Sequence, residues 1–154
     1  MKPTASPAPA PPFALEDFLP YRLSVLSNTV SDAIAALYRT RFDLTMTEWR
    51  CMAILYRFAP VPAQEVARRG AMDKVQVSRA VAALAAKGHV LLATDRTDRR
   101  RSKLALSAAG RRLHDEILPL ARGVEARLLA AFDAQQRRSL DAALVRLAAA
   151  AAAL

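Results

Sequence analysis

The chain is poor in the residues on which disulfides, metal sites and tight β-turns depend. Its 154 residues include one cysteine, two histidines and four glycines. One cysteine cannot form an internal disulfide, and no CxxC pair or His/Cys cluster has the spacing of a metal site. Scarce glycine and abundant alanine favour helices over sheets. We therefore expect a mostly α protein without a structural metal or a cofactor.

Long apolar runs and catalytic motifs are also missing. The longest apolar run, residues 147–154, is far shorter than the ~20 residues of a membrane span. The first residues lack the apolar stretch of a signal peptide. The sequence has no glycine-rich phosphate loop, nucleophile elbow or zinc-binding histidine pair. These absences predict a protein that is not an enzyme, has no membrane partner and lies in the cytoplasm.

Positive charge, by contrast, is plentiful and concentrated in one segment. The formal net charge is +9 at pH 7, and residues 68–112 hold twelve Lys or Arg side chains against three Asp. This segment therefore has a surplus of nine positive charges, and the rest of the chain sums to zero. Evenly spread charge would indicate only solubility, whereas concentrated charge is typical of a nucleic-acid surface. Residues 68–112 are our candidate DNA-contacting segment.

The two ends of the chain have the pattern of helices that need a partner. Residues 1–12 are rich in proline, which predicts a flexible arm. Within residues 13–43, apolar side chains recur every three or four positions and predict one long helix that ends near Arg41. Residues 107–154 have the same periodicity in two helices, with an alanine run at the end that we expect to fray. The recurring apolar residues of the first segment are Leu19, Leu23, Leu26, Val30, Ile34 and Leu37. Those of the last segment are Leu113, Ile117, Leu120, Val124, Leu128, Leu140, Leu144 and Leu147.

Residues 44–106 are predicted to form a lobe between these ends, beginning with a core helix. Thr45 or Thr47 is placed to cap this helix, which is apolar nearly all round. Prolines at 60 and 62 break it, and a short helix follows that Gly70 can close. Cys51 lies in the middle of the apolar helix, so we interpret it as a buried, unreactive thiol rather than a redox sensor.

A second capped helix follows and divides into two faces. Asp73 and Gln76 have the spacing of a capping box at its start. One sector holds the apolar side chains Val77, Ala80, Val81 and Leu84, and the opposite side holds Val75, Gln76 and Arg79, with Ser78 at its flank. A small, polar and basic outward face suits insertion into a major groove.

Residues 89–94 and 102–106 are predicted to form two strands joined by an arginine-rich loop. Ser107 is placed to cap the next helix.

Three motifs in this order resemble the MarR family of bacterial transcriptional regulators. They are LTMTEWRCMAIL (44–55), MDKVQVSRAVAAL (72–84) and DRTDRRRSKLALSAAGR (95–111). The resemblance covers roughly residues 19–147. It implies a winged helix-turn-helix lobe flanked by N- and C-terminal helices that interleave with those of a second copy. It also implies a homodimer that binds double-stranded DNA at a pseudo-palindromic site, a repressor of transcription and an association with the nucleoid.

The resemblance assigns DNA contacts to the second capped helix and to the loop between the strands. In the family, an aspartate of this loop orients an arginine that enters the minor groove, and these positions correspond to Asp98 and Arg100. A narrow minor groove attracts a guanidinium that a carboxylate holds extended. The expected base contacts are Gln76, Ser78 and Arg79, with Val75 against a thymine methyl, and the expected phosphate contacts are Lys74, Arg96, Arg99, Arg101 and Lys103.

The family also binds small aromatic effectors between the dimerisation helices and the DNA-binding lobe. By position, the corresponding residues are Ser24, Asn28, Thr47, Trp49 and Arg50. Many relatives carry arginines where this chain has Ser24 and Val25, which disfavours a strongly anionic, arginine-clamped ligand but is compatible with a small aromatic acid held by hydroxyls and one amide. The alternative function is an architectural winged helix that binds DNA with little sequence preference, or that docks another protein.

Overall fold

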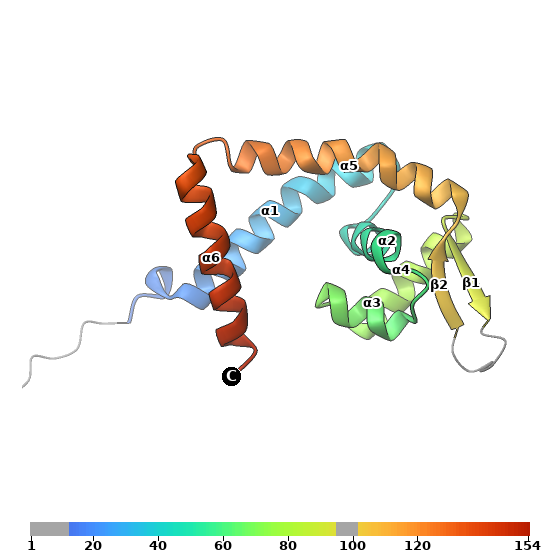
Figure 1. Cartoon of the computed structure of the whole chain (residues 1–154), viewed down its shortest axis with the longest axis horizontal. Coiled ribbons are helices and arrows are strands. Elements are labelled where there is room, and N and C mark those ends of the chain that lie inside the picture. The colour runs from blue at the N-terminus through green and yellow to red at the C-terminus, as the bar shows by residue number, and fades with distance from the viewer. Residues whose placement is uncertain (1–12, 95–101) are drawn as a thin grey trace, which may run out of the picture.

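The computed structural model describes residues 13–94 and 102–154. In this part of the chain the protein is mostly helical and has one β-hairpin (Figure 1). Helices, a short 3-10 turn and two antiparallel strands follow the order predicted for a winged helix. This arrangement confirms the mostly α winged-helix fold. The elements are η1 (Leu15–Asp17), α1 (Leu19–Phe42), α2 (Met46–Phe58), α3 (Ala63–Gly70), α4 (Lys74–Ala86), β1 (Val90–Thr94), β2 (Ser102–Leu106), α5 (Ala108–Leu128) and α6 (Ala134–Ala151).

The hydrophobic core lies where α2, α3, α4 and the hairpin meet. Cys51, Met52 and Leu55 of α2 are fully buried and pack with the inner face of α4. The predicted inner residues Val77, Ala80, Val81 and Leu84 are all buried, so this prediction is confirmed. The other buried apolar side chains of the cluster are Tyr38, Leu44, Val66, Ala67, Val90, Leu104, Leu106 and Ile117.

Side-chain caps begin most of the long helices, as the sequence predicts. Thr45, rather than Thr47, caps α2 in a complete capping box with Glu48. Ser107 caps α5 by accepting from the Gly110 N–H, and Asp133 and Gln136 form a second capping box at α6. Each such cap stabilises its helix by about 1 kcal/mol.

Two predicted helix ends are wrong in detail. Asp73 caps α4 by accepting from the Val75 and Gln76 N–H groups, but the described hydrogen bonds include no return bond from the Gln76 side chain. Gly70 does not close α3, because it is itself helical and Ala71 takes the left-handed conformation, with φ of 47°. A Cβ at Gly70 would lie 2.4 Å from Cε of Met72 and 3.0 Å from Cδ1 of Ile54, so the ends of these two flexible side chains would have to shift to make room for it.

The hairpin pairs β1 with β2 from Val90 opposite Leu106 to Thr94 opposite Ser102. The predicted second strand is confirmed, and the first begins at Val90 rather than at His89. Val61, between the two prolines before α3, forms an isolated antiparallel β-bridge with Leu104 of the hairpin. Its N–H donates to the Leu104 carbonyl at 3.2 Å, and its own carbonyl accepts from the Leu104 N–H at 2.8 Å. The middle of β2 is therefore joined to the segment that leads into α3.

The terminal helices extend away from this lobe. In Figure 1, α5 runs along one side of the molecule, and α6 and the first turns of α1 lie at the end opposite the hairpin. The long N-terminal helix begins at Leu19 rather than Phe13, and the alanine run is helical as far as Ala151 rather than frayed. No residue of α6 is buried. In the described part of the chain, no helix has the length and apolar character to span a membrane.

Candidate nucleic-acid interface

The outward face of α4 presents the side chains predicted to read DNA. Lys74, Val75, Gln76, Ser78 and Arg79 are all exposed, whereas the opposite face of the helix is buried. Val75 keeps 57% of its surface accessible, although it is an apolar residue on a helix with a fully formed core face. The helix therefore offers two hydrogen-bonding side chains, two cations and one apolar contact on a single surface.

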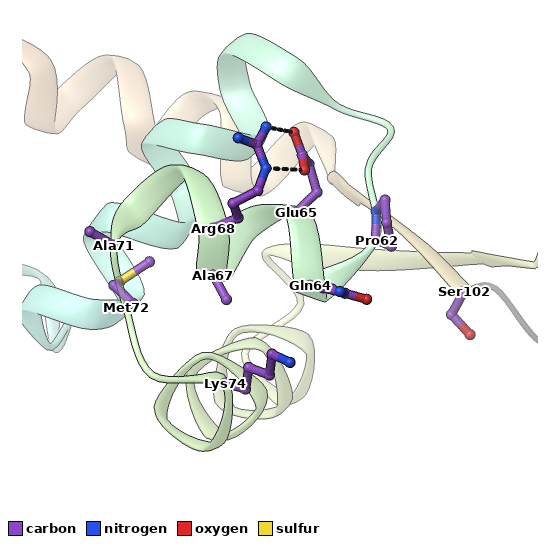
Figure 2. Close-up of a pocket in the computed structure, with 9 residues that line it drawn as sticks. All are labelled: Pro62, Gln64, Glu65, Ala67, Arg68, Ala71, Met72, Lys74 and Ser102. Carbon is purple, nitrogen blue, oxygen red and sulfur yellow. Dashed lines mark hydrogen bonds and ion pairs between the residues drawn. The ribbon is translucent and has the colours of Figure 1, made fainter. Parts of the chain in front are cut away.

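A groove runs beside the first turn of α4, between α3 and β2 (Figure 2). Its volume is about 830 Å³. Figure 2 shows Gln64, Lys74 and Ser102 bordering it from three different elements, α3, α4 and β2. Sequence reasoning did not find Gln64 or Ser102, because their proximity to Lys74 depends on how the hairpin folds back against α3. The remaining lining residues are Pro62, Glu65, Ala67, Arg68, Ala71 and Met72.

Two of the basic residues counted in the charged segment share a single carboxylate partner within α3. Arg68 forms two hydrogen bonds with the Glu65 carboxylate, at 2.8 and 2.6 Å, and Nε of Arg69 lies 2.7 Å from the same carboxylate. The hydrogen bond from Arg68, aided by both guanidinium charges, lowers the pKa of Glu65 to about 2. The Arg69 guanidinium also stacks 3.9 Å from the centre of the Phe58 ring. The charge count over 68–112 therefore overstates the free charge near α3, because Glu65 lies just outside that window.

The loop between the strands lies largely outside the described residues. Arg96, Asp98, Arg99, Arg100 and Arg101, the predicted minor-groove and phosphate contacts, all fall in this part of the chain. Lys103 is described, is partly buried on β2, and pairs in register with Ala93. Its position beside Ser102 places it at the loop end of β2, one residue from the groove in Figure 2.

A separate cavity of about 370 Å³ lies between α1, α2 and α5. Trp49 and Arg50, two of the five residues predicted for an effector, line this cavity. Ser24 and Asn28 are exposed on α1 and do not line it, and Thr47 faces a different groove, beside Gln76 and Arg79. The full lining is Ser27, Val30, Ser31, Ile34, Tyr38, Met46, Trp49, Arg50, Ala121, Val124, Glu125 and Leu128.

The cavity is backed by a stack of aromatic rings that sequence reasoning did not predict. The Trp49 ring lies 5.5 Å from Tyr38 and 5.3 Å from His114 between ring centroids. His114 is 5% exposed and stacks on Tyr56 at 3.8 Å. Among the described residues, His, Cys, Asp and Glu do not gather into a possible metal site. His114 instead joins α5 to α2.

Cys51 is completely buried in α2, within the hydrophobic core. Burial first, and the nearby Glu48 carboxylate second, raise the pKa of the Cys51 thiol to about 11. A thiol with so high a pKa forms little thiolate near neutral pH and is a poor nucleophile. This environment agrees with the prediction of an unreactive thiol.

Comparisons with known proteins bear on both the interface and the cavity. A profile of the MarR family matches residues 42–101, the segment from the end of α1 through the loop of the hairpin. A search among curated proteins finds no match. A MarR/EmrR family transcriptional regulator from Acinetobacter sp. ADP1 superposes with a TM-score of 0.86 at 22% identity, over 92% of this chain and 100% of that one.

Two further solved structures are similar over most of their length. A probable transcriptional regulator from Pseudomonas aeruginosa is 29% identical, with a TM-score of 0.76 over 87% of this chain and 99% of that one. BpsR of Bordetella bronchiseptica, whose DNA binding is regulated by 6-hydroxynicotinic acid, is 19% identical, with a TM-score of 0.78 over 90% and 98% of the two chains. At 19 and 22% identity, the likeness is one of fold.

Proposed function

This chain belongs to the MarR family of winged-helix transcriptional regulators, and from that premise we propose that it is a repressor released from its operator by a small aromatic ligand. The family relation supports a DNA-binding regulator rather than an enzyme. The repressor role, the pseudo-palindromic operator and the effector are the proposal. A relative whose DNA binding responds to 6-hydroxynicotinic acid supports the choice of an aromatic effector.

The observation that carries the DNA-binding proposal is the division of α4 into two faces. Val77, Ala80, Val81 and Leu84 fix the helix to the core, and the remaining surface is exposed and basic. We propose that Gln76, Ser78 and Arg79 contact base edges, because amides and guanidiniums match the donor and acceptor pattern of the major groove. Lys74, beside the groove, and Lys103, at the loop end of β2, are assigned to phosphates. From the sequence, Arg96, Arg99 and Arg101 join them, and Asp98 orients Arg100 into the minor groove.

Exposed apolar surface on the terminal helices supports a homodimer. Leu26 is 60% exposed and Val145 is 70% exposed, although both lie on long, well-formed helices. Many large apolar residues exposed on the same helices mark an interaction site. We propose that residues 13–43 and 107–154 dimerise, so that two copies of α4 face successive turns of the major groove. Phe13, Leu15, Phe18, Leu19, Tyr21, Leu23, Leu128, Leu144 and Leu147 are also exposed.

We assign the effector to the cavity between α1, α2 and α5. Trp49 and Tyr38 offer aromatic surfaces, and Arg50 offers a cation for a carboxylate. Ser27 and Ser31 replace Ser24 and Asn28 as the hydroxyl donors of α1, because they line the cavity and the predicted pair does not. An effector bound here would contact the dimerisation helix α1 and the lobe helix α2 together. It releases DNA only if it binds more tightly to the arrangement in which two α4 helices no longer match the operator.

The test measures DNA binding at two salt concentrations, with the chain's own upstream region and with random duplex as competitor. A specific regulator should prefer its operator by about a thousandfold or more, whereas an architectural protein should bind both nearly equally. A panel of small aromatic acids is then titrated, and Trp49, the single tryptophan of the chain, reports binding by its fluorescence. Equal affinity for both DNAs at both salt concentrations would refute the repressor proposal.

A matched pair of arginine variants tests the cavity. Arg50 lines the cavity, whereas Arg57 is an exposed residue of the same helix that does not line it. Arg50→Met should weaken binding of an aromatic acid by about tenfold or more, the effect of losing one charge-assisted hydrogen bond, and Arg57→Met should not. Equal effects of both variants on the fluorescence titration would remove Arg50 from the effector site.

A further inference from the structure

Lys87 connects the end of α4 to the corner between α1 and α2. Lys87 is the C-cap residue of α4. Its Nζ lies 3.3 Å from Oδ2 of Asp43 and 3.3 Å from Oε1 of Glu48, and it also donates to the main-chain carbonyl of Asp43. Asp43 and Glu48 lie about forty residues earlier in the chain, at separations of 44 and 39. One side chain therefore joins the ends of three helices.

The corner that Lys87 reaches is itself tightly held. Asp43 ends α1 in the left-handed conformation, with φ of 52°, and its N–H donates to the Arg39 carbonyl. Glu48 is only 3% exposed, and its second carboxylate oxygen accepts from the Thr45 N–H at 2.6 Å. A buried carboxylate that keeps both a backbone donor and a cation holds its partners in one geometry. Movement of this corner would therefore move Lys87 with it.

The position of Lys87 argues against a contact with DNA. The outward face that we assign to DNA lies in the first turns of α4, next to the Asp73 cap. Lys87 is fourteen residues after Asp73, which is about 20 Å along the helix axis at 1.5 Å per residue. Two carboxylates already accompany its charge. It is a basic residue of the charged segment with a role other than binding phosphate.

The same corner borders the effector cavity. Tyr38 and Met46, which line the cavity, stand on either side of residues 43–45, and the Tyr38 carbonyl accepts from the Leu44 N–H at 3.3 Å. We propose that Lys87 is a positioning residue for DNA recognition, which holds α4 to the α1–α2 corner so that the cavity and the DNA-reading helix move as one unit. This inference rests on the proposed function, because it requires that α4 reads DNA.

The test compares variants of Lys87 with one of Lys74, on a duplex that the wild-type protein has enriched from a random library. Lys87→Met keeps the aliphatic stem and removes the ammonium group. We expect its DNA affinity to fall by about tenfold, within the range usual for coupled sites, with an unchanged dependence on salt. Lys87→Arg should recover most of the affinity. Lys74→Met, the matched control, should instead reduce the slope of log affinity against log salt by about 0.9, as expected for one lost phosphate contact.

Loss of folding is separated from loss of position by a double variant. Lys87→Met leaves the buried Glu48 carboxylate without its cation, which destabilises the lobe, so Lys87→Met/Glu48→Gln removes both charges. All DNA titrations are made at a temperature well below the thermal unfolding midpoint of the least stable variant. Affinity still reduced in the double variant supports a positioning role, because the tie to Asp43 is still absent. Wild-type affinity in the folded double variant would overturn it, as would a reduced salt slope in Lys87→Met.

A second measurement needs no DNA and therefore separates this inference from the proposed function. Amide hydrogen exchange reports opening of the last turn of α4 and of residues 43–45. We expect faster exchange in both segments in Lys87→Met and in the double variant, and wild-type exchange in Lys87→Arg. Unchanged exchange at the corner would show that Lys87 does not hold it, whatever the protein binds. Absence of any selective DNA binding by the wild-type protein would instead refute the proposed function.

Discussion

Replacing Gly110 by alanine should destabilise the protein, although alanine is the better helix former. Gly110 is buried in the first turn of α5, and a Cβ there would lie 2.1 Å from the carbonyl oxygen of His89. That carbonyl belongs to the main chain of the turn between α4 and β1, so it cannot rotate away as a side chain would. The start of α5 must therefore move away from this turn by roughly 1 Å, the amount needed to restore a normal contact distance.

The cost of that movement follows from the contacts at the same place. The Ser107 N–H donates to the His89 carbonyl at 3.0 Å, and its hydroxyl donates to the Gly88 carbonyl at 2.6 Å. Two weakened hydrogen bonds cost about 1 kcal/mol each, and overpacking adds about 1 to 3 kcal/mol. The higher helix propensity of alanine offsets about 1 kcal/mol of this loss of stability. The net loss is about 3 kcal/mol, or roughly 6 to 12 °C in Tm for a domain of this size.

The control is Gly123→Ala in the same helix. A Cβ at Gly123 meets no atom within 4 Å, so only the propensity gain remains and stability should rise by up to about 1 kcal/mol. Both variants are compared with wild type by thermal and urea unfolding at one protein concentration, because a dimer unfolds at a concentration-dependent temperature. Equal stability of the Gly110 and Gly123 variants would refute the argument from close approach.

Three further predictions follow from other parts of the molecule. Arg79→Ala should relax discrimination at one or two base pairs by roughly 1 to 3 kcal/mol each, and a uniform loss on all sequences in binding assays would make Arg79 a phosphate contact. Leu26→Asp should shift sedimentation towards the monomer, whereas Leu91→Asp, on the hairpin with a similar exposure of 55%, should not. Cys51 ionises near pH 9 when unfolded and near 11 when folded, so the folded state loses about 2 to 3 kcal/mol between these pH values. Urea unfolding of Cys51→Ala should lack this part of the loss, and rapid alkylation of native Cys51 at neutral pH would contradict its burial.

The features that sequence reasoning predicted are those set by short-range chemistry. The inner face of α4 follows from a helical period of 3.6 residues, and the Ser107 cap follows from the need of the first N–H groups of α5 for an acceptor. The second strand was predicted residue by residue because its alternation is unambiguous. The order of helices and hairpin was sufficient to identify the winged helix.

The features that it missed depend on how distant segments meet. Ser27 and Ser31 have the same four-residue spacing as Ser24 and Asn28, and only the rotation of α1 against α2 and α5 decides which pair lines the cavity. Thr47 was predicted to contact the effector, but it lines the groove beside Arg79 rather than the cavity that Trp49 and Arg50 line. The left-handed Ala71 was missed because glycine is the usual residue in that conformation, whereas α3 includes Gly70 and ends one residue later.

The short bridge between Val61 and Leu104 has a mechanical consequence. Its two main-chain hydrogen bonds join the hairpin to the segment ahead of α3, so a rotation of the hairpin alone would break both bonds. In the homodimer that we propose, a reorientation of either copy would then move α3, α4 and the hairpin together as one rigid body. The distance between the two rigid bodies, rather than the internal shape of either one, would decide whether both α4 helices fit the proposed operator.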